Sequence, residues 1–452
     1  MRQAKMSYFV HSDENRKEML KTIGIGSIEE LFDCIPENIC NPEIELDKPL
    51  DEKSLKEELC VIGGKNKMIK NFFSFIGGGA YNHYIPGAVK SILGISQFYT
   101  SYTPYQAEIS QGTLQYMFEF QSLICRITGM DISNASMYDG ASSLAEAILM
   151  AGKINGNKKV LLSAAVNPQY REVCRTYCSG QNIDIKEVGY KNGKTDINLI
   201  RDEMDEMAGS VIIIIQNPNF FGCFEDVYEL HDILKKYPEC FFIAVINPMS
   251  IGLIKRPSDY GADIVVGEGQ VFGNALSFGG PYLGFFATKK DYLRQIPGRI
   301  VGQTVDTDGN KTFVLTFQNR EQHIRKYKAT SNICTNHSLN ALAATVYLSI
   351  IGENGLRHIS NICLQRAHYF AEKIKPLDKF QLKFNSGFFN EFVLSSRLNI
   401  RDVIDRFYKN KILPGIYLGD NYPELRDCIL VSITEMNSIE SINKYTEVLK
   451  SF

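Results

Sequence analysis

The pattern of apolar and polar positions is most regular between residues 91 and 300, where short apolar runs alternate with longer amphipathic segments. The amphipathic segments repeat apolar side chains every three or four residues, as helices do. The short runs are rich in β-branched or aromatic residues, as strands are. Strands that alternate with helices of this length are joined by crossover connections, so the pattern predicts an α/β fold with a mostly parallel sheet. The predicted strands are 160–162, 183–188, 211–215, 241–246, 264–266 and 283–287.

The two ends of the chain have different patterns. Residues 1–90 are polar with helical periodicity, and they finish in a loop that is rich in glycine, residues 76–87. At the other end a helical stretch, residues 339–374, leads into a mixture of strand-like and helical segments. The sequence therefore predicts a helical N-terminal segment with a glycine-rich loop up to residue 90, then a large α/β domain over 91–330. A smaller α+β C-terminal domain is predicted over 331–452.

Composition and charge narrow the classes of partner. The chain has 452 residues, of which 44% are hydrophobic and 22% charged, and its formal net charge is −2. A chain this close to neutral has no global electrostatic reason to bind nucleic acid or an anionic membrane. No apolar run approaches the roughly 20 residues that a membrane span requires. The N-terminal residues also lack the apolar core of a secretory signal.

Eleven cysteines include no CxxC pair. Cys174 and Cys178 could place two thiolates on one helical face, but they belong to a full apolar stripe with Tyr170, Val173 and Tyr177. Core packing is favoured over metal ligation, because free cysteine behaves as a small hydrophobic residue. The sequence predicts no metal site, and this use of cysteine is typical of a reducing cytoplasm.

The candidate chemistry begins with a loop that has no lysine. Residues 261–290 contain a strand, a glycine-rich turn and a second strand, a natural place for a lysine that holds an aldehyde cofactor, yet no lysine lies between Lys255 and Lys289. Asn247 follows another strand, where a pyridinium cofactor requires a carboxylate. These absences indicate a cofactor fold whose own site has lost its chemistry. An ordinary helix N-cap competes with a phosphate-binding cup as the interpretation of the small residues Gly140, Ser142 and Ser143.

Two irregular segments carry polar and aromatic side chains of the kind that form sites on loops. His83 lies in the glycine-rich loop, where a general acid or base competes with a structural histidine as the interpretation. A basic run from Arg320 to Lys328 can be a solvated surface or can hold an anion. The remaining candidates are Tyr102, Thr103, Tyr105 and Glu108 before a helix, and Thr330, Ser331 and Asn332 after the basic run.

Six long segments of the chain are distinctive in their order and spacing: GGGAYNHYIP, FYTSYTPYQAEISQGTLQYMFEFQ, MYDGASSLAEA, GRIVGQTVDTDG, REQHIRKYKATSNICT and VSITEMNS. They resemble the amino-terminal half of the glycine cleavage system P proteins, the glycine dehydrogenases (decarboxylating). The resemblance extends from near residue 6 to the C-terminus, and the length fits the split form of this family, as subunit 1. It implies the aspartate aminotransferase-like fold of enzymes dependent on pyridoxal phosphate, fold type I.

The resemblance also implies how the chain takes part in catalysis. Pyridoxal phosphate is expected on a lysine of a second subunit, the beta subunit or subunit 2, and not on this chain. The two subunits are expected to form an α2β2 tetramer that decarboxylates glycine and transfers the aminomethyl group to the lipoyl arm of H protein. Residues expected to reach the partner's site are Tyr102, Thr103, Tyr105, Glu108 and His83. Thr330, Ser331 and Asn332 are expected to contact its cofactor, while the cup at Gly140, Ser142 and Ser143 is expected to be vestigial.

Two alternatives remain at this stage. The chain could be a self-sufficient enzyme of the same fold that uses another lysine, such as Lys255 or Lys289, although neither position suits the loop. It could also be a structural or regulatory partner that stabilises the cofactor-bearing chain without contributing to catalysis.

Overall fold

The computed structural model describes residues 11–40, 45–156, 158–206 and 211–452, which form two compact units, Met1–Lys67 and Met68–Phe452. Among its described residues, the first unit contains two α-helices, α1 (Asp13–Ile23) and α2 (Glu52–Gly63). Each begins at a side-chain cap, Ser12 for α1 and Asp51 for α2, which satisfies a free backbone N–H of the first turn. Neither helix has a buried residue.

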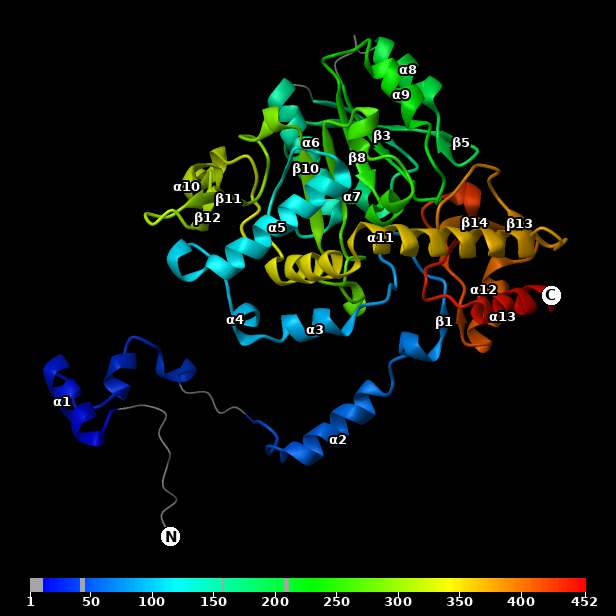
Figure 1. Cartoon of the computed structure of the whole chain (residues 1–452). Helices are drawn as coiled ribbons and strands as arrows, with labels where there is room; N and C mark the ends of the chain where they lie inside the picture. Colours follow the sequence, from blue (N-terminus) through cyan, green and yellow to red (C-terminus); the bar gives the residue numbers. More distant parts are fainter. Residues whose placement is uncertain (1–10, 41–44, 157, 207–210) are drawn as a thin grey trace. The chain divides into compact units, whose positions relative to one another are not determined.

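The second unit is built on a seven-stranded sheet with the order β2-β10-β9-β8-β7-β3-β4 (Figure 1). The five strands from β9 to β4 are parallel, and β10 and β2 add an antiparallel edge. Each of the six predicted strands is confirmed. Their observed bounds are β3 Lys159–Ser163, β4 Asp184–Val188, β7 Ile212–Gln216, β8 Phe241–Ile246, β9 Ile264–Glu268 and β10 Gly284–Thr288. The seventh strand, β2 (Ile132–Ser133), was not predicted.

The central strands β7, β8, β9 and β10 are buried on both faces and are largely apolar, whereas the edge strand β4 is mostly exposed. In β7, Ile212 and Ile214 contribute to one core, while Ile213 and Ile215 contribute to the core on the opposite face. The first core is closed by α6 (Gly140–Asn155) and α7 (Pro168–Ser179), and the second includes residues of α5 (Gln111–Thr128). Cys174 and Cys178 are buried, unpaired thiols in the first core, as the apolar stripe predicted.

A kinked helix, α11 (Ser338–Ile374), connects the large sheet to the C-terminal part of the unit. Its first part packs in the core over the sheet, and its last part packs in the C-terminal core. The kink is at Gly352, which has a φ of 56°. The C-terminal sheet has the order β13-β14-β17-β16, from Phe380–Leu382, Glu391–Ser396, Cys428–Ser432 and Ile416–Tyr417.

The remaining elements complete the second unit. Short strand pairs are β1 (Phe73–Ser74) with β15 (Ile412–Leu413), β5 (Tyr190–Lys191) with β6 (Lys194–Thr195), and β11 (Ile300–Val305) with β12 (Lys311–Thr316). The other helices are α3 Gly87–Leu93, α4 Ser96–Tyr99, α8 Ile197–Glu206, α9 Val227–Leu234, α10 Gln322–Arg325, α12 Ile400–Lys409 and α13 Ile439–Lys450. Among the described residues, no helix combines the length and hydropathy needed to cross a bilayer. The domain boundaries expected at residues 90 and 330 stay predictions.

Candidate functional site

The carboxyl edge of the large sheet brings the N-terminus of α6 next to the end of β9. Helix α6 begins at Asp139, whose side chain accepts a hydrogen bond from the backbone N–H of Ser142 at 2.7 Å. The backbone N–H of Gly140, the first residue of the helix, points at β9 and donates to Oε2 of Glu268 at 3.0 Å. The position where a phosphate would meet the helix dipole is therefore occupied by a carboxyl group of the chain itself.

The Glu268 carboxyl is held by two further backbone donors. The N–H groups of Gln270 and Leu283 donate to its Oε1 at 3.0 and 2.9 Å. Burial raises the pKa of Glu268 to about 7, because the surrounding N–H groups offset only part of the cost of burying the charge. Glu268 thus ties together the start of α6, the end of β9 and the start of β10.

The space expected for a cofactor ring is also filled. Asn247 follows β8, and its side chain caps the next turn by accepting the N–H of Met249 at 3.1 Å. The cavity beside Asn247 and Glu268 has a volume of only about 20 Å³, far below the roughly 300 Å³ of small cofactor sites. A Cβ on Gly140 would lie 2.2 Å from the Tyr170 hydroxyl, so Tyr170 reaches into the cup. The residues of this chain do not fit pyridoxal phosphate at this edge of the sheet.

No lysine of this region is placed to hold an aldehyde cofactor. Lys289 follows β10, and its ammonium pairs with Asp263 at the opposite end of the sheet. Asp263 precedes β9 while Glu268 ends it, so the lysine lies on the order of 15 Å from the cup. Lys255 is exposed in the loop after the turn that Asn247 caps. The geometry disfavours the self-sufficient enzyme.

A buried polar network joins this edge to the glycine-rich loop. The side chain of Gln270 accepts from the Tyr81 N–H at 2.8 Å and donates to the Tyr81 carbonyl at 3.0 Å. The Tyr81 hydroxyl donates to Oε2 of Glu391 in β14 at 2.7 Å, and the Gly78 N–H donates to Oε1 at 2.8 Å. These side chains were missed by sequence reasoning. Glu268 ends a strand, so the rule that selected Asn247 could also have found it.

The predicted tyrosine loop and the basic run come together on one side of the second unit. The guanidinium of Arg299 lies 5.6 Å from the Tyr105 ring centre, and the rings of Tyr105 and His323 are 6.1 Å apart. Tyr102 and Glu108 are exposed, and Thr103 is half-buried. Of the basic run, Arg320 is structural, because its guanidinium donates to the carbonyls of residues 296 and 298.

The predicted Thr330, Ser331 and Asn332 line a hollow of about 750 Å³. Its rim includes three lysines, and its floor includes Glu146 of α6, a buried carboxyl that is 2% exposed. Burial raises the pKa of Glu146 to about 7, partly offset by a hydrogen bond with Ser331. The three lysines are Lys153, Lys158 and Lys328. Glu146 was not singled out from the sequence.

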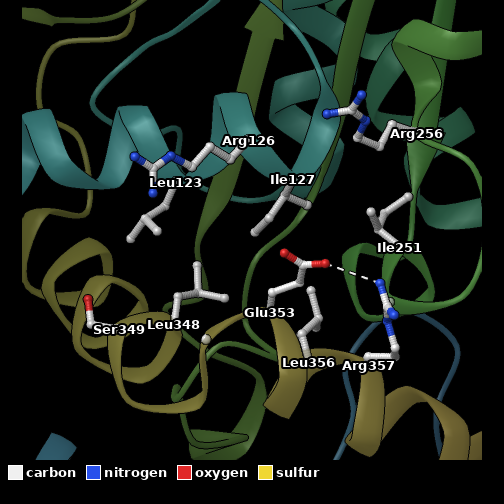
Figure 2. Close-up of a pocket in the computed structure, with 12 residues that line it drawn as sticks. Leu123, Arg126, Ile127, Ile251, Arg256, Leu348, Ser349, Glu353, Leu356 and Arg357 are labelled. Atoms are coloured by element: carbon white, nitrogen blue, oxygen red, sulfur yellow. Dashed lines mark hydrogen bonds and ion pairs between the residues drawn. The ribbon is translucent and has the colours of Figure 1, made fainter.

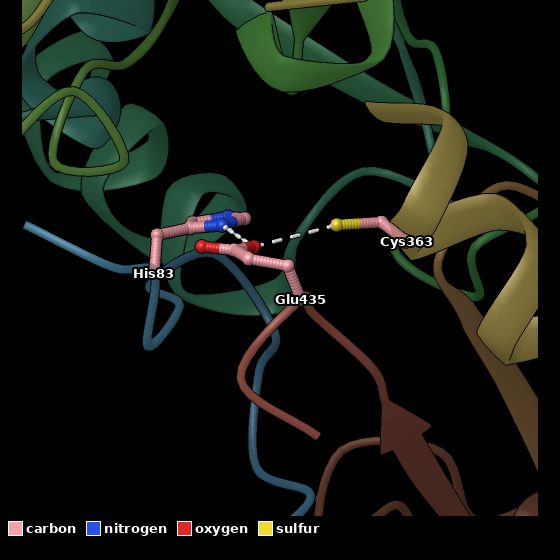
Figure 3. A group of neighbouring side chains, drawn as sticks. All are labelled: His83, Cys363 and Glu435. Atoms are coloured by element: carbon pink, nitrogen blue, oxygen red, sulfur yellow. Dashed lines mark hydrogen bonds and ion pairs between the residues drawn. The ribbon is translucent and has the colours of Figure 1, made fainter. Parts of the chain in front are cut away.

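His83 lies away from these surfaces, in the group of side chains shown in Figure 3. Its Nδ1 is 2.7 Å from Oε2 of Glu435, and the Cys363 thiol is 3.6 Å from the same oxygen. Burial would raise the pKa of Glu435, but the hydrogen bond and charge of His83 lower it overall. Two ligands of one tetrahedral zinc ion lie about 3.3 Å apart, so the 2.7 Å contact of His83 with Glu435 is that of a hydrogen bond. His83 joins the glycine-rich loop to the segment after β17.

A further hollow of about 730 Å³ lies between α5 and the kink of α11 (Figure 2). Arg126, Arg256 and Arg357 line it, and Arg357 is paired with Glu353 at 3.1 Å. None of the residues predicted from the sequence lines this hollow.

Comparisons with known proteins show the family of this chain. Residues 6–449 match the family model of the glycine cleavage system P-protein. Probable glycine dehydrogenase (decarboxylating) subunit 1 of Moorella thermoacetica is 46% identical, over 98% of this chain and 99% of the relative. The corresponding protein of Dictyoglomus turgidum is 48% identical with the same coverage.

The structure is similar to a crystal structure of glycine decarboxylase (P-protein) of the glycine cleavage system in inhibitor-bound form. The TM-score is 0.88 at 37% identity, over 99% of this chain and 100% of the other. Glutamate decarboxylase of Lactobacillus brevis has the same fold, with a TM-score of 0.68 at 13% identity over 93% and 96% of the chains. The prediction of fold type I, the fold of pyridoxal-phosphate-dependent enzymes, is confirmed. The chain belongs to the glycine cleavage system P-protein family.

Proposed function

We propose that this chain is subunit 1 of a split P protein, which with a subunit that carries pyridoxal phosphate decarboxylates glycine. The aminomethyl group passes to the lipoyl arm of H protein. The observation that carries this proposal is the Glu268 carboxyl at the start of α6, held by three N–H groups where a cofactor phosphate would bind. Because its own phosphate position is filled, this subunit depends on a cofactor that subunit 2 holds. The two subunits form an α2β2 assembly.

Of the residues proposed to reach the partner's site, four are exposed and three are half-buried. The exposed ones are Tyr102, Tyr105, Glu108 and Asn332, and the half-buried ones are Thr103, Thr330 and Ser331. Tyr102 and Glu108 present a phenol and a carboxylate that can hold the amine or carboxylate of glycine. Tyr105 and Thr103 support this loop, since the Tyr105 N–H donates to the Thr103 carbonyl at 2.9 Å. The hydroxyl and amide side chains of residues 330–332 can donate to the phosphate of the partner's cofactor. His83, which is buried, acts by holding the glycine-rich loop in place.

The proposal is tested by reconstitution from purified subunits. The isolated chain, incubated with pyridoxal phosphate and borohydride, is expected to retain no covalent pyridoxyl group, because no lysine lies at the filled cup. With lipoylated H protein, neither subunit alone is expected to exchange bicarbonate into glycine above background, whereas the equimolar mixture exchanges. An isolated chain that binds the cofactor covalently and exchanges bicarbonate unaided would contradict the proposal.

Substitutions on the exposed loop distinguish a subunit that contributes to catalysis from a structural partner that does not. Tyr102→Phe and Glu108→Gln in the reconstituted enzyme are expected to lower the exchange rate at least about tenfold, as the loss of a positioned polar group does. The measurement is the initial rate of bicarbonate exchange at saturating H protein. Matched controls are Tyr228→Phe and Glu229→Gln on α9, which are also exposed and are expected to retain the wild-type rate. Full activity of both loop variants would favour the structural partner.

A further inference from the structure

Arg299 is fixed in place by the segments that surround it. It precedes β11, and its backbone carbonyl accepts the N–H of Ala135, which follows β2, at 2.8 Å. Its guanidinium donates to Oδ1 of Asn336 at 3.4 Å, and the Asn336 amide donates to the Ala135 carbonyl at 3.3 Å. Arg320 holds the preceding turn by donating to two of its carbonyls. The Arg299 side chain therefore projects from a rigid base.

The guanidinium of Arg299 is nearly excluded from water but is incompletely paired. The side chain is 3% exposed, and its Nε is 3.9 Å from Oε2 of Glu321. Nε has no hydrogen-bond partner among the described residues. Removing a charge from water costs more free energy than so long an ion pair returns. This arrangement favours a role in orienting neighbouring groups over a role in stability.

The tyrosine loop, residues 100–110, lies over this guanidinium. The centre of the Tyr105 ring is 5.6 Å from the guanidinium carbon of Arg299. The imidazole of His323 meets the same ring in a T-shaped arrangement, at 6.1 Å between ring centres. Nδ1 of His323 is 3.6 Å from Oε2 of Glu321, the oxygen that also pairs with Arg299. Tyr105 is therefore held by two groups that share one carboxylate.

We propose that Arg299 is a positioning residue, which orients the tyrosine loop so that Tyr102 and Glu108 hold glycine at the partner's site. The inference rests on the proposed function, because it requires these two side chains to contact the substrate. Pro104 is buried and anchors the backbone of the loop. The cation–π contact of Arg299 with Tyr105 then sets the direction of the ring, and a planar guanidinium suits this contact better than an ammonium group.

The kinetic consequence follows from the population of correctly placed loops. Loss of the contact with Tyr105 leaves a smaller fraction of chains with the loop in the competent position. The KM for glycine then rises in inverse proportion to that fraction, while kcat at saturating glycine changes little. A residue that supports only the fold behaves differently, because its loss lowers the amount of active enzyme and leaves KM unchanged.

Hydrogen exchange of the isolated chain tests the contact without a partner. In Arg299→Met the amides of residues 100–110 are expected to exchange about tenfold faster, as the loss of a cation–π contact predicts. Tyr105→Leu removes the same contact from the exposed side and is expected to have the same effect. Tyr105→Phe keeps the ring and is expected to exchange at the wild-type rate. Arg401→Met is the matched control, since its guanidinium lies over the Tyr417 ring in the C-terminal part of the unit.

Bicarbonate exchange in the mixture with subunit 2 and lipoylated H protein tests the link to the substrate. Arg299→Met is expected to raise the KM for glycine about tenfold and to keep kcat within about twofold of the wild type. Arg299→Lys, which keeps the charge but not the planar group, is expected to raise KM less. Arg401→Met is expected to leave both constants unchanged.

The outcomes separate the inference from the proposed function. Wild-type loop exchange in both Arg299→Met and Tyr105→Leu would overturn the inference. So would additive effects in the double variant, since the two residues would then act separately. Faster loop exchange with an unchanged KM for glycine would also overturn it. A wild-type mixture that exchanges no bicarbonate would instead overturn the proposed function.

Discussion

Replacing Glu268 by alanine is expected to lower the free energy of unfolding by about 3–5 kcal/mol. The substitution leaves three buried N–H groups, those of Gly140, Gln270 and Leu283, without their acceptor. Each unsatisfied buried donor costs about 1–3 kcal/mol, and water entering the vacated space offsets part of the sum. Chemical denaturation of the isolated chain, followed by circular dichroism, measures the change. A loss below about 1 kcal/mol would show that the carboxyl is not a structural acceptor.

Glu268→Gln is the matched control. The difference in the free energy of unfolding between the wild type and this variant is expected to depend on pH. The glutamine side chain keeps the size and one acceptor but cannot ionise. Burial raises the pKa of Glu268 to about 7 in the folded chain, above its value of 4.5 when exposed. The free energy of unfolding of the wild type, relative to that of Glu268→Gln, is therefore largest below pH 4.5 and decreases as pH rises through 7. The total decrease is about 3 kcal/mol at most. An advantage that grows from pH 5 to pH 8 would contradict this assignment.

Gly222→Ala is expected to destabilise the chain by about 3–5 kcal/mol, through strain and overpacking together. Gly222 has a φ of 84°, and a Cβ there would lie 2.0 Å from the backbone carbonyl oxygen of Glu391. This glycine lies where the loop after β7 meets the C-terminal sheet, since its carbonyl accepts the N–H of Phe389 at 3.1 Å. The clash is with backbone, so no side-chain rotation relieves it. The midpoint of thermal unfolding measures the effect.

Gly309→Ala separates the two causes of that loss. Gly309 has a nearly identical φ of 83°, in the turn between β11 and β12, but a Cβ there has nothing within 4 Å. Only the backbone strain is added, and the expected cost is about 1–2 kcal/mol. Equal losses in the two variants would mean that the contact with Glu391 is not the cause.

Much of the fold follows from local pattern, and the candidate site follows only in part. Five of the six predicted strands, β3, β7, β8, β9 and β10, are apolar runs that are almost fully buried, whereas β4 at the sheet edge is mostly exposed. The start of α7 is likewise encoded locally, because the Asn167 side chain accepts the N–H of Gln169 and Pro168 occupies the first helical position. Asn247 was found because ligand sites follow strand ends. The hydrogen bond of His83 with Glu435 was not found, because 352 positions separate the partners.

The sequence by itself determined the order of strands and helices, the family, and the absence of a lysine between Lys255 and Lys289. Only the tertiary structure decided that the cup is filled by Glu268, 128 positions from Gly140. The physical reason is that the periodicity of apolar residues shows only which face of its own helix or strand a side chain occupies. Which other element packs against that face depends on the path of the whole chain, and the local pattern does not encode this path.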